Sequence, residues 1–144
     1  MPTFQDLDPL DMPWALNSIF VLRRRDDGLF AYQVVGEGMA TRLGGRLKGK
    51  TAFDVFEDSY AEWTEARWQK AATERSACFV HTQHLTAAGV PLNAERLMFP
   101  LQGESDRVDS LIGVTEFSGR VSQLRLGDGQ VDFLEIIWTP VDQL

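Results

Sequence analysis

Apolar residues occur along the chain in short blocks, separated by glycines, prolines and charged residues. The block at residues 19–25 leads into the turn sequence Asp26-Asp27-Gly28, and a second block follows at residues 29–35. Two strand-like blocks on either side of a glycine turn are typical of a β-hairpin. The pattern therefore predicts two antiparallel strands near the start of the chain.

The next region changes from glycine-rich to helix-forming. Five glycines between residues 36 and 49 leave room only for short helical turns and loops. Ser59 and Glu62 then have the spacing of a capping box, which predicts a long helix from there to about Arg75. The helix has a broad apolar face that is expected to lie on a sheet. Two neighbouring stripes form this face: Tyr60, Trp63 and Ala71, and Ala61, Trp68 and Ala72.

Three more strands are predicted after the helix, at residues 77–86, 92–102 and 110–117. The segments between them, 88–91 and 103–106, have the composition of turns. Short links favour an antiparallel meander, whereas the long middle connection can cross and cover one face of the sheet. The sequence thus predicts an α+β fold, a five-stranded antiparallel sheet covered on one face by short helices and one long helix.

Both ends of the chain carry weaker signals. Helix-entry residues at positions 8–13 predict that residues 1–18 form a short N-terminal segment with a helical turn. Residues 120–144 are expected to be a C-terminal extension. Within it, the turn sequence Gly127-Asp128-Gly129 precedes an apolar run at residues 131–139. Such a run needs cover, so it is expected to be extended or packed on its own domain or on a dimer mate.

Composition narrows the class of protein. A chain of 144 residues with 44% hydrophobic residues is long and apolar enough to fold as one domain around a single core. The net charge is −7, and the one basic run, Arg23-Arg24-Arg25, is followed directly by two aspartates. Nucleic-acid binding requires a basic face, so a nucleic-acid partner is not expected.

Other sequence signals favour a cytoplasmic protein without a metal site. No apolar run approaches the length of a membrane-spanning helix, and the first residues lack the pattern of a secretory signal, so no membrane partner is expected. Cys78 is the only cysteine, which excludes an intrachain disulfide and a thiolate zinc site.

The order strand, strand, helical crossover and three strands resembles the PAS domain family. Residues 29–37 resemble the second PAS strand and its exit, and residues 44–50 (GGRLKGK) resemble a phrase of a subfamily of short stand-alone bacterial PAS proteins. Residues 96–101, which end in Pro-Leu, resemble the fourth strand of that subfamily, and residues 7–9 resemble its entry segment. Residues 19–119 are therefore expected to be a PAS-like domain, whereas the segment before Leu7 is shorter than in such proteins.

The resemblance implies a cup-shaped sheet that can enclose a small apolar or anionic ligand. Each residue that would line this cup is also explained by ordinary core packing. The candidate pocket residues are Tyr32, Val34, Met39, Phe53, Phe56, Trp68, Phe79, Met98, Val114 and Phe117.

The sequence supports neither the flavin site nor the haem site of PAS proteins, so the cofactor of this chain is unknown. A flavin photosensor of this fold would carry a cysteine in an Asn-Cys-Arg phrase on the helical segment, but Cys78 lies at the start of a strand. A haem sensor would need an axial histidine on the long helix or its exit loop, but residues 60–75 contain none. His81 and His84 differ by three positions on a strand, so they point to opposite faces and cannot share a metal ion.

Two polar residues remain candidates for the cup. His81 is expected to point inward with Phe79, either as a hydrogen-bonded core histidine or as a ligand-orienting or pH-sensing group, while His84 is expected to face solvent. Arg96 is the preferred anchor for an anionic ligand. The alternative interpretation is that Arg96 is a surface arginine on the outer face of the sheet.

Three functions follow from these patterns. The favoured one is a PAS-type sensory module that binds a small ligand or a partner, has no enzymatic activity and signals to a separate protein. A homodimeric interaction module without a ligand is the second. A small cone-shaped α+β enzyme with an apolar pocket, using His81 or an acidic residue as a base, is the third. The sequence contains no nucleophile elbow, no His-Glu-x-x-His and no phosphate loop, since Gly45 and Gly49 are separated by three residues instead of four.

Overall fold

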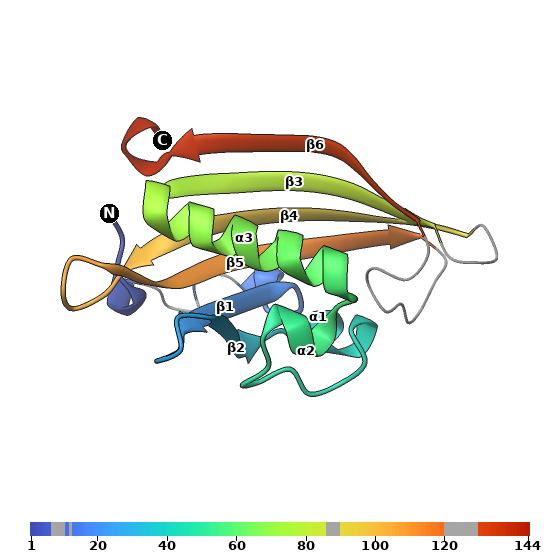
Figure 1. Ribbon diagram of the computed structural model, residues 1–144, viewed down its shortest axis with the longest axis horizontal. Helices are drawn as coiled ribbons and strands as arrows, with labels where there is room; N and C mark the ends of the chain where they lie inside the picture. The colour runs from blue at the N-terminus through green and yellow to red at the C-terminus, as the bar shows by residue number, and fades with distance from the viewer. Residues whose placement is uncertain (7–10, 12, 86–89, 120–129) are drawn as a thin grey trace.

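A computed structural model of the chain describes residues 1–6, 11, 13–85, 90–119 and 130–144 (Figure 1). The elements follow one another as a short hairpin, a helical connection and four long strands. In chain order they are η1 (Phe4–Asp6), η3 (Pro13–Ala15), β1 (Ile19–Arg24), β2 (Phe30–Val35), α1 (Glu37–Arg42), α2 (Ala52–Val55), α3 (Asp58–Glu74), β3 (Ser76–Leu85), β4 (Pro91–Gln102), β5 (Val108–Gly119), β6 (Gln130–Pro140) and η4 (Val141–Gln143).

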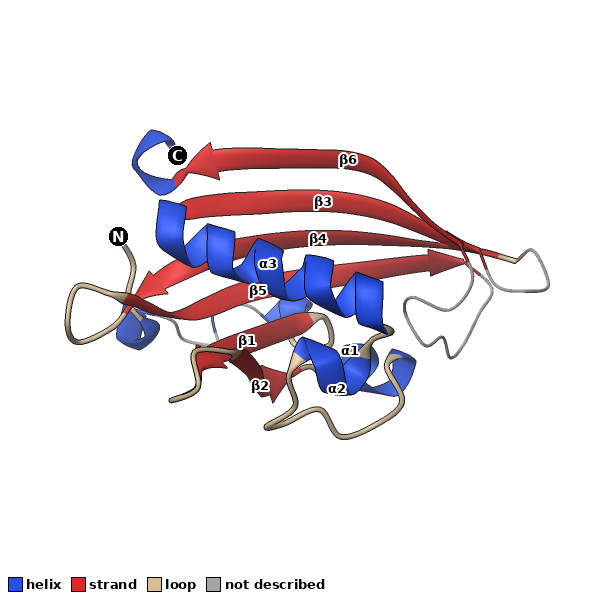
Figure 2. Ribbon diagram, viewed as in Figure 1, coloured by secondary structure: helices blue, strands red, loops and turns tan. Residues whose placement is uncertain are grey.

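The strands of the described residues form one six-stranded sheet in the order β2-β1-β5-β4-β3-β6. Every neighbouring pair is antiparallel. Helix α3 lies along one face of this sheet, and α1 and α2 lie beside it near the β1–β2 hairpin (Figure 2). The predicted α+β fold class is confirmed, with six strands instead of five. The sixth strand is the apolar run of the C-terminal extension, which pairs with β3.

The predicted strands agree with the observed ones within two residues at the described ends. Three predicted signals fall wholly or partly on residues outside the described part of the chain: Asp8-Pro9, the turn at residues 88–91 and the turn at residues 127–129. No helix in the described part of the chain is long and apolar enough to cross a membrane.

The start of the long helix differs from the prediction. Helix α3 begins after Glu57, so Ser59 already lies inside its first turn and forms no capping box with Glu62. The capping box of this region lies instead at the start of α2. There the Asp54 carboxylate accepts hydrogen bonds from the Thr51 backbone N–H at 2.9 Å and from the Thr51 hydroxyl at 3.2 Å. Both pairs have the required spacing, and spacing alone does not choose between them.

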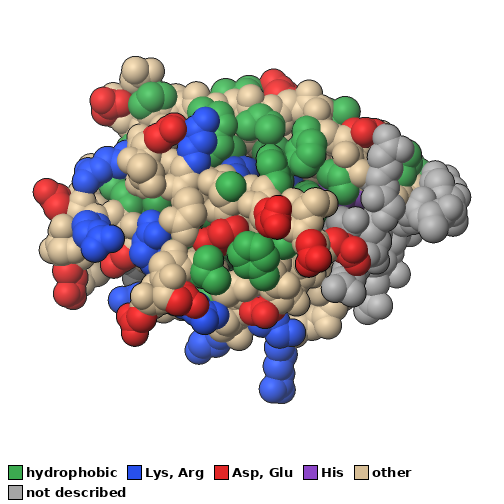
Figure 3. Space-filling model, viewed as in Figure 1, with side chains coloured by type: hydrophobic (Ala, Val, Ile, Leu, Met, Phe, Trp, Pro, Cys, Tyr) green, Lys and Arg blue, Asp and Glu red, His purple; other side chains and the backbone are tan. Residues whose placement is uncertain are grey.

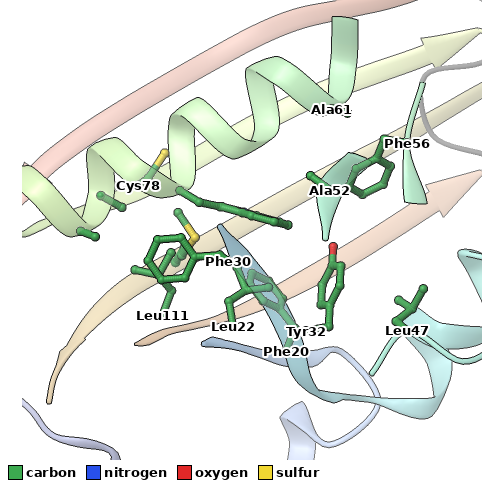
Figure 4. Packing of buried hydrophobic residues seen from close by; sticks show 14 of the residues in the cluster. Phe20, Leu22, Phe30, Tyr32, Leu47, Ala52, Phe56, Ala61, Cys78 and Leu111 are labelled. Atoms are coloured by element: carbon green, nitrogen blue, oxygen red, sulfur yellow. The ribbon is translucent and has the colours of Figure 1, made fainter. Parts of the chain in front are cut away.

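The core lies between α3 and the sheet face that it covers (Figure 4). The ring of Tyr32 meets the indole of Trp68 edge-on, with centroids 5.6 Å apart, and meets Phe20 at 6.4 Å. Trp68 is fully buried and Trp63 is half-buried against the same core. A buried aromatic side chain of this size contributes about 2–3 kcal/mol through removal of apolar surface from water, so this face of α3 fixes the helix on the sheet.

A polar network also joins α3 to the β1–β2 turn. The Gln69 amide donates to the Gly28 carbonyl at 2.8 Å and to Glu65 Oε1 at 2.7 Å, and Arg24 Nη1 donates to Gln69 Oε1 at 2.7 Å. Glu65 in turn accepts the Phe30 backbone N–H at 3.3 Å. Burial raises the pKa of the Glu65 carboxyl. The hairpin is therefore held to the helix by hydrogen bonds as well as by packing.

Candidate ligand-binding site

A small cavity lies inside the cup, between α3 and the sheet. Its volume is about 10 Å³, close to the space of one water molecule. Six aromatic side chains, two arginines and two threonines dominate its lining. The lining residues are Phe20, Tyr32, Met39, Phe56, Tyr60, Thr64, Arg67, Trp68, Arg96, Thr115 and Phe117.

A larger hollow of about 520 Å³ lies elsewhere, between the N-terminal segment and the β4–β5 turn. Its lining is polar and includes exposed side chains such as Gln5, Arg23 and Glu104. Water can satisfy such groups, so this hollow requires no ligand. The interior cavity is the better candidate because several of its polar groups are out of reach of water.

Those interior groups are buried without partners. Arg67 and Arg96 are each 6% exposed. Arg67 Nε, Arg96 Nη2, Trp68 Nε1 and the hydroxyls of Thr64 and Thr115 have no hydrogen-bond partner within the part of the chain that the structure describes. A buried donor left unsatisfied costs about 1–3 kcal/mol, and native proteins contain few of them. Their concentration around one cavity makes it the candidate site.

Arg96 reaches the cavity from the middle of β4. Its Nη1 donates to the Thr82 hydroxyl at 3.1 Å, and the Thr82 hydroxyl is hydrogen-bonded to His84 Nε2 at 2.9 Å. The Tyr60 ring of α3 lies edge-on to the His84 imidazole, with centroids 5.7 Å apart. Burial and, secondarily, the charge of Arg96 lower the pKa of His84 to about 4. The imidazole is thus neutral at neutral pH.

The electrostatics of the site are positive. Burial, followed by the nearby Arg96 charge, lowers the pKa of Arg67 to about 10, which still leaves its guanidinium charged at neutral pH. Burial also raises the pKa of the Tyr32 hydroxyl, so this phenol is neutral. None of the lining residues is acidic.

The predicted pocket residues divide between the two faces of the sheet and the surface. Tyr32, Met39, Phe56, Trp68, Arg96 and Phe117 line the cavity, and Met98 is buried in the core cluster beside it. Phe53 is 46% exposed on α2, whose buried residue is Ala52. The prediction that Phe53 lines the pocket is therefore wrong, because a four-residue helix turns only one side to the core.

Val34 is misplaced because of an irregularity in the hairpin. Leu22 pairs with Tyr32 but Val21 pairs with Val34, so the register shifts by one residue between them. Tyr32 and Val34 would share a face in a regular strand, but the bulge turns Val34 away, where it is 43% exposed. The alternation of the sequence does not show where a bulge occurs.

Phe79, His81 and Val114 lie on the sheet face opposite α3. Cys78, Val80, Thr82 and His84 are the buried set of β3, so the predictions that His81 points inward and that His84 faces solvent are both wrong. His81 Nε2 is hydrogen-bonded to Asn93 Oδ1 at 3.1 Å instead. Large apolar residues occur at both odd and even positions of this strand, so the alternating pattern predicted the wrong face for the two histidines.

Several residues that line the cavity were not among the pocket residues predicted from the sequence. Tyr60, Thr64 and Arg67 lie at spacings of four and three on the buried face of α3. A threonine and an arginine within an otherwise apolar helical stripe were the available signal, since polar residues on a core face need a partner. Glu95, next to Arg96, is exposed.

A family model described as a PAS domain matches residues 1–116. The chain belongs to the PAS domain family. No curated protein matches it.

Solved structures share the PAS fold at low identity. A light-oxygen-voltage domain studied with a flavin analogue aligns with a TM-score of 0.54 and 13% identity, over 77% of this chain and 84% of that chain. The Vibrio cholera VqmA–ligand–DNA complex gives 0.52 and 13%, over 77% of this chain and 51% of that chain. The Rhodobacter sphaeroides LOV protein gives 0.51 and 12%, over 79% and 70%. These PAS structures support the fold alone.

The flavin of the light-oxygen-voltage domains does not fit this interior. The side chains of Trp68 and Tyr32 meet across the centre of the cup, leaving a cavity of about 10 Å³. Cys78 is buried on β3, outside the helical connection, and burial raises the pKa of its thiol. Among the described residues, no group of three or more His, Cys, Asp or Glu side chains could hold a metal ion.

Proposed function

We propose that this PAS domain is a cytoplasmic sensory module that binds a small ligand in the cavity between α3 and the sheet and passes the signal to a separate protein. PAS membership assigns the chain to a sensory class of domains. The observation that supports a ligand is the set of unpartnered buried polar atoms around the cavity, contributed by α3, β4 and β5. A ligand that bonds these atoms would remove their desolvation cost.

Two similar structures add support for small-molecule binding in this fold. VqmA has been solved bound to DPO and in a complex with a ligand and DNA. The proposal assigns binding and no chemistry to this chain. The enzyme alternative used His81 or an acidic residue as a base, but His81 lies on the sheet face opposite the cavity and none of the residues that line the cavity is acidic.

The test combines native mass spectrometry with thermal unfolding of the purified protein. We expect a co-purified small molecule, or a metabolite that raises the melting temperature, because a ligand bound only to the folded state stabilises it. Thr64→Leu, which fills the cavity with apolar atoms, should abolish that stabilisation. Thr73→Leu, on the exposed side of the same helix, should leave it unchanged. Equal stabilisation of both variants would place the ligand elsewhere.

A homodimeric interaction module is the second candidate. The exposed apolar residues Phe133, Leu134, Ile136 and Ile137 on the edge strand β6 favour it. Hydrophobic side chains lie along β6 and the adjoining side of α3 (Figure 3). VqmA has been described as a dimer. Light scattering at micromolar concentration should give twice the monomer mass, and Ile137→Lys should return it to one; a monomer in both would remove this candidate.

A further inference from the structure

Two positive charges are buried in the cup without a negative partner among the described residues. Arg67 on α3 and Arg96 on β4 are each 6% exposed, and both line the cavity. Neither has a carboxylate within 4 Å in the described ranges; the ion pair Arg25–Asp27 lies on the surface. Buried charges are normally paired, because removal of a lone ion from water is strongly unfavourable.

The contacts that these arginines make do not replace a counter-ion. The Arg67 guanidinium lies over the Trp63 ring, 4.7 Å from its centroid, and Arg96 Nη1 donates to the neutral Thr82 hydroxyl. Arg67 Nε and Arg96 Nη2 still have no acceptor among the described residues. The two charges also repel each other, which contributes to the lowered pKa of Arg67. Among the described residues, the charge of each arginine and one of its side-chain nitrogens are therefore uncompensated.

We infer that the ligand is a small anion, a carboxylate or an inorganic oxyanion, held between Arg67 and Arg96. This inference rests on the proposed function and names the class of its ligand. The unpartnered groups are donors: two guanidinium N–H groups, the Trp68 indole N–H and the hydroxyls of Thr64 and Thr115. An anion accepts from all of them and neutralises charge, whereas a water molecule or a neutral ligand satisfies some donors and leaves the charge.

The size of the cavity limits the ligand. A space of about 10 Å³ holds about one water molecule, so an anion larger than a single atom has to displace a wall. Phe117 is the half-buried wall residue on β5, and the Arg42 guanidinium lies 5.6 Å from the centroid of its ring. Since the other lining residues are buried, rotation of Phe117 is the movement that we expect to enlarge the cavity toward solvent. The smallest carboxylates are therefore the first probes.

The experiment is a thermal-unfolding titration of the purified protein in a zwitterionic buffer, with sodium formate, acetate, phosphate or chloride as the probe. At least one anion should raise the melting temperature saturably, by roughly 5–10 °C at 100 times its dissociation constant. Arg67→Met and Arg96→Met should remove the saturable rise. Arg46→Met, on the exposed glycine-rich connection, should retain it.

A second measurement separates a ligand anchor from a structural arginine. Without added anion, Arg96→Met should melt at or above the temperature of the unmodified protein, because it removes an unpaired buried charge. A structural arginine would melt lower on replacement, which would overturn the inference. If Arg67→Met fails to fold, the side-chain Nε–H resonances of the unmodified protein serve as the readout for that residue. Titration with the stabilising anion should then shift two of these resonances together.

The outcomes distinguish this inference from the proposed function. A neutral metabolite that stabilises the unmodified protein and both arginine variants equally would overturn the anion and retain the sensor. A salt effect of equal size in all variants would also overturn the anion, as a general ionic effect. If neither anions nor neutral metabolites stabilise the protein and no molecule co-purifies, both the inference and the proposed function fail.

Discussion

The Thr82 hydroxyl and His84 Nε2 lie 2.9 Å apart on the helix-facing side of β3, where neither side chain reaches solvent. Arg96 of β4 donates to the same hydroxyl, and the Tyr60 ring of α3 covers the imidazole. A histidine enclosed in this way is disfavoured as a cation, both by burial and by the neighbouring guanidinium.

This arrangement predicts a loss of stability in mild acid. The unfolded chain protonates His84 near pH 6.5, whereas the folded protein does so only near its pKa of about 4. Between these values the unfolded state binds more protons, so the free energy of unfolding falls as the pH is lowered, by on the order of 3 kcal/mol in total. Denaturant unfolding at pH 7, 6, 5 and 4 measures this dependence.

The two histidines of the chain provide a matched pair of variants. His84→Gln should flatten the pH dependence between pH 6.5 and 4. His81→Gln, which changes the histidine on the opposite face, should leave the dependence unchanged. If the unmodified protein and His84→Gln show parallel curves, the buried imidazole is not the titrating group.

The order and type of the elements could be predicted because they depend on local patterns. A glycine turn between two apolar blocks, a helical stripe that contains Trp68, and turn segments at residues 88–91 and 103–106 each act within a few residues. The PAS resemblance added the cup. The alternation of side chains along the strand allowed Arg96 to lie either in the cup or on the surface, and the structure shows it buried.

Whether an individual side chain points to the core or to solvent could not be predicted, because its direction depends on contacts between distant parts of the chain. His84 is buried in spite of its polarity, because Thr82 provides its partner and α3 its cover. Val34 points outward because of a register shift opposite β1. Arg67 was not among the predicted residues, because the burial of an arginine in an apolar stripe becomes evident only when the helix is placed on the sheet.

Gly113 is predicted to be intolerant of a side chain. It pairs with Phe20 of β1 and Met98 of β4 in the centre of the sheet. A Cβ atom there would lie 2.6 Å from the Leu97 carbonyl oxygen and would also overlap the Phe20 ring. Gly113→Ala should lower the free energy of unfolding by about 1–3 kcal/mol in denaturant titrations, because backbone and core ring must both move. Ser118→Ala, exposed on the same strand, should change it by less than about 0.5 kcal/mol.

Gln69 is predicted to hold the β1–β2 hairpin to α3. Its amide donates to Gly28 and Glu65 and accepts from Arg24. Gln69→Leu should cost about 1–3 kcal/mol, because partly buried partners lose their hydrogen bonds. Thermal unfolding measures the loss, and hydrogen exchange should show faster exchange in the hairpin. Thr73→Leu, an exposed change on the next turn of the helix, is the control; an equal loss in both variants would argue against the network.

Two side-chain contacts join β6 to α3, and one of them is a pair of aromatic rings. The rings of Trp63 and Phe133 lie 4.4 Å apart between centroids, and Lys70 lies 4.6 Å from the centroid of the Trp138 ring. A groove of about 230 Å³ between the helix and the strand is lined by residues of both contacts, including Trp63, Lys70 and Trp138. The strand is thus joined to the helix at two points and to β3 by its ladder.

Phe133→Ala should therefore loosen β6 without unfolding the domain. An aromatic pair of this kind contributes about 0.5–1.5 kcal/mol beyond its buried area, and local opening requires less free energy than global unfolding. Hydrogen exchange should speed up on β6 and on the β3 groups that pair with it, while β1 and β5 remain protected. Leu134→Ala, at the bulge where the β3–β6 register shifts, removes an exposed side chain and should have a smaller effect. Equal exchange of β6 in the two variants would show that the ladder, and not the ring pair, holds the sixth strand.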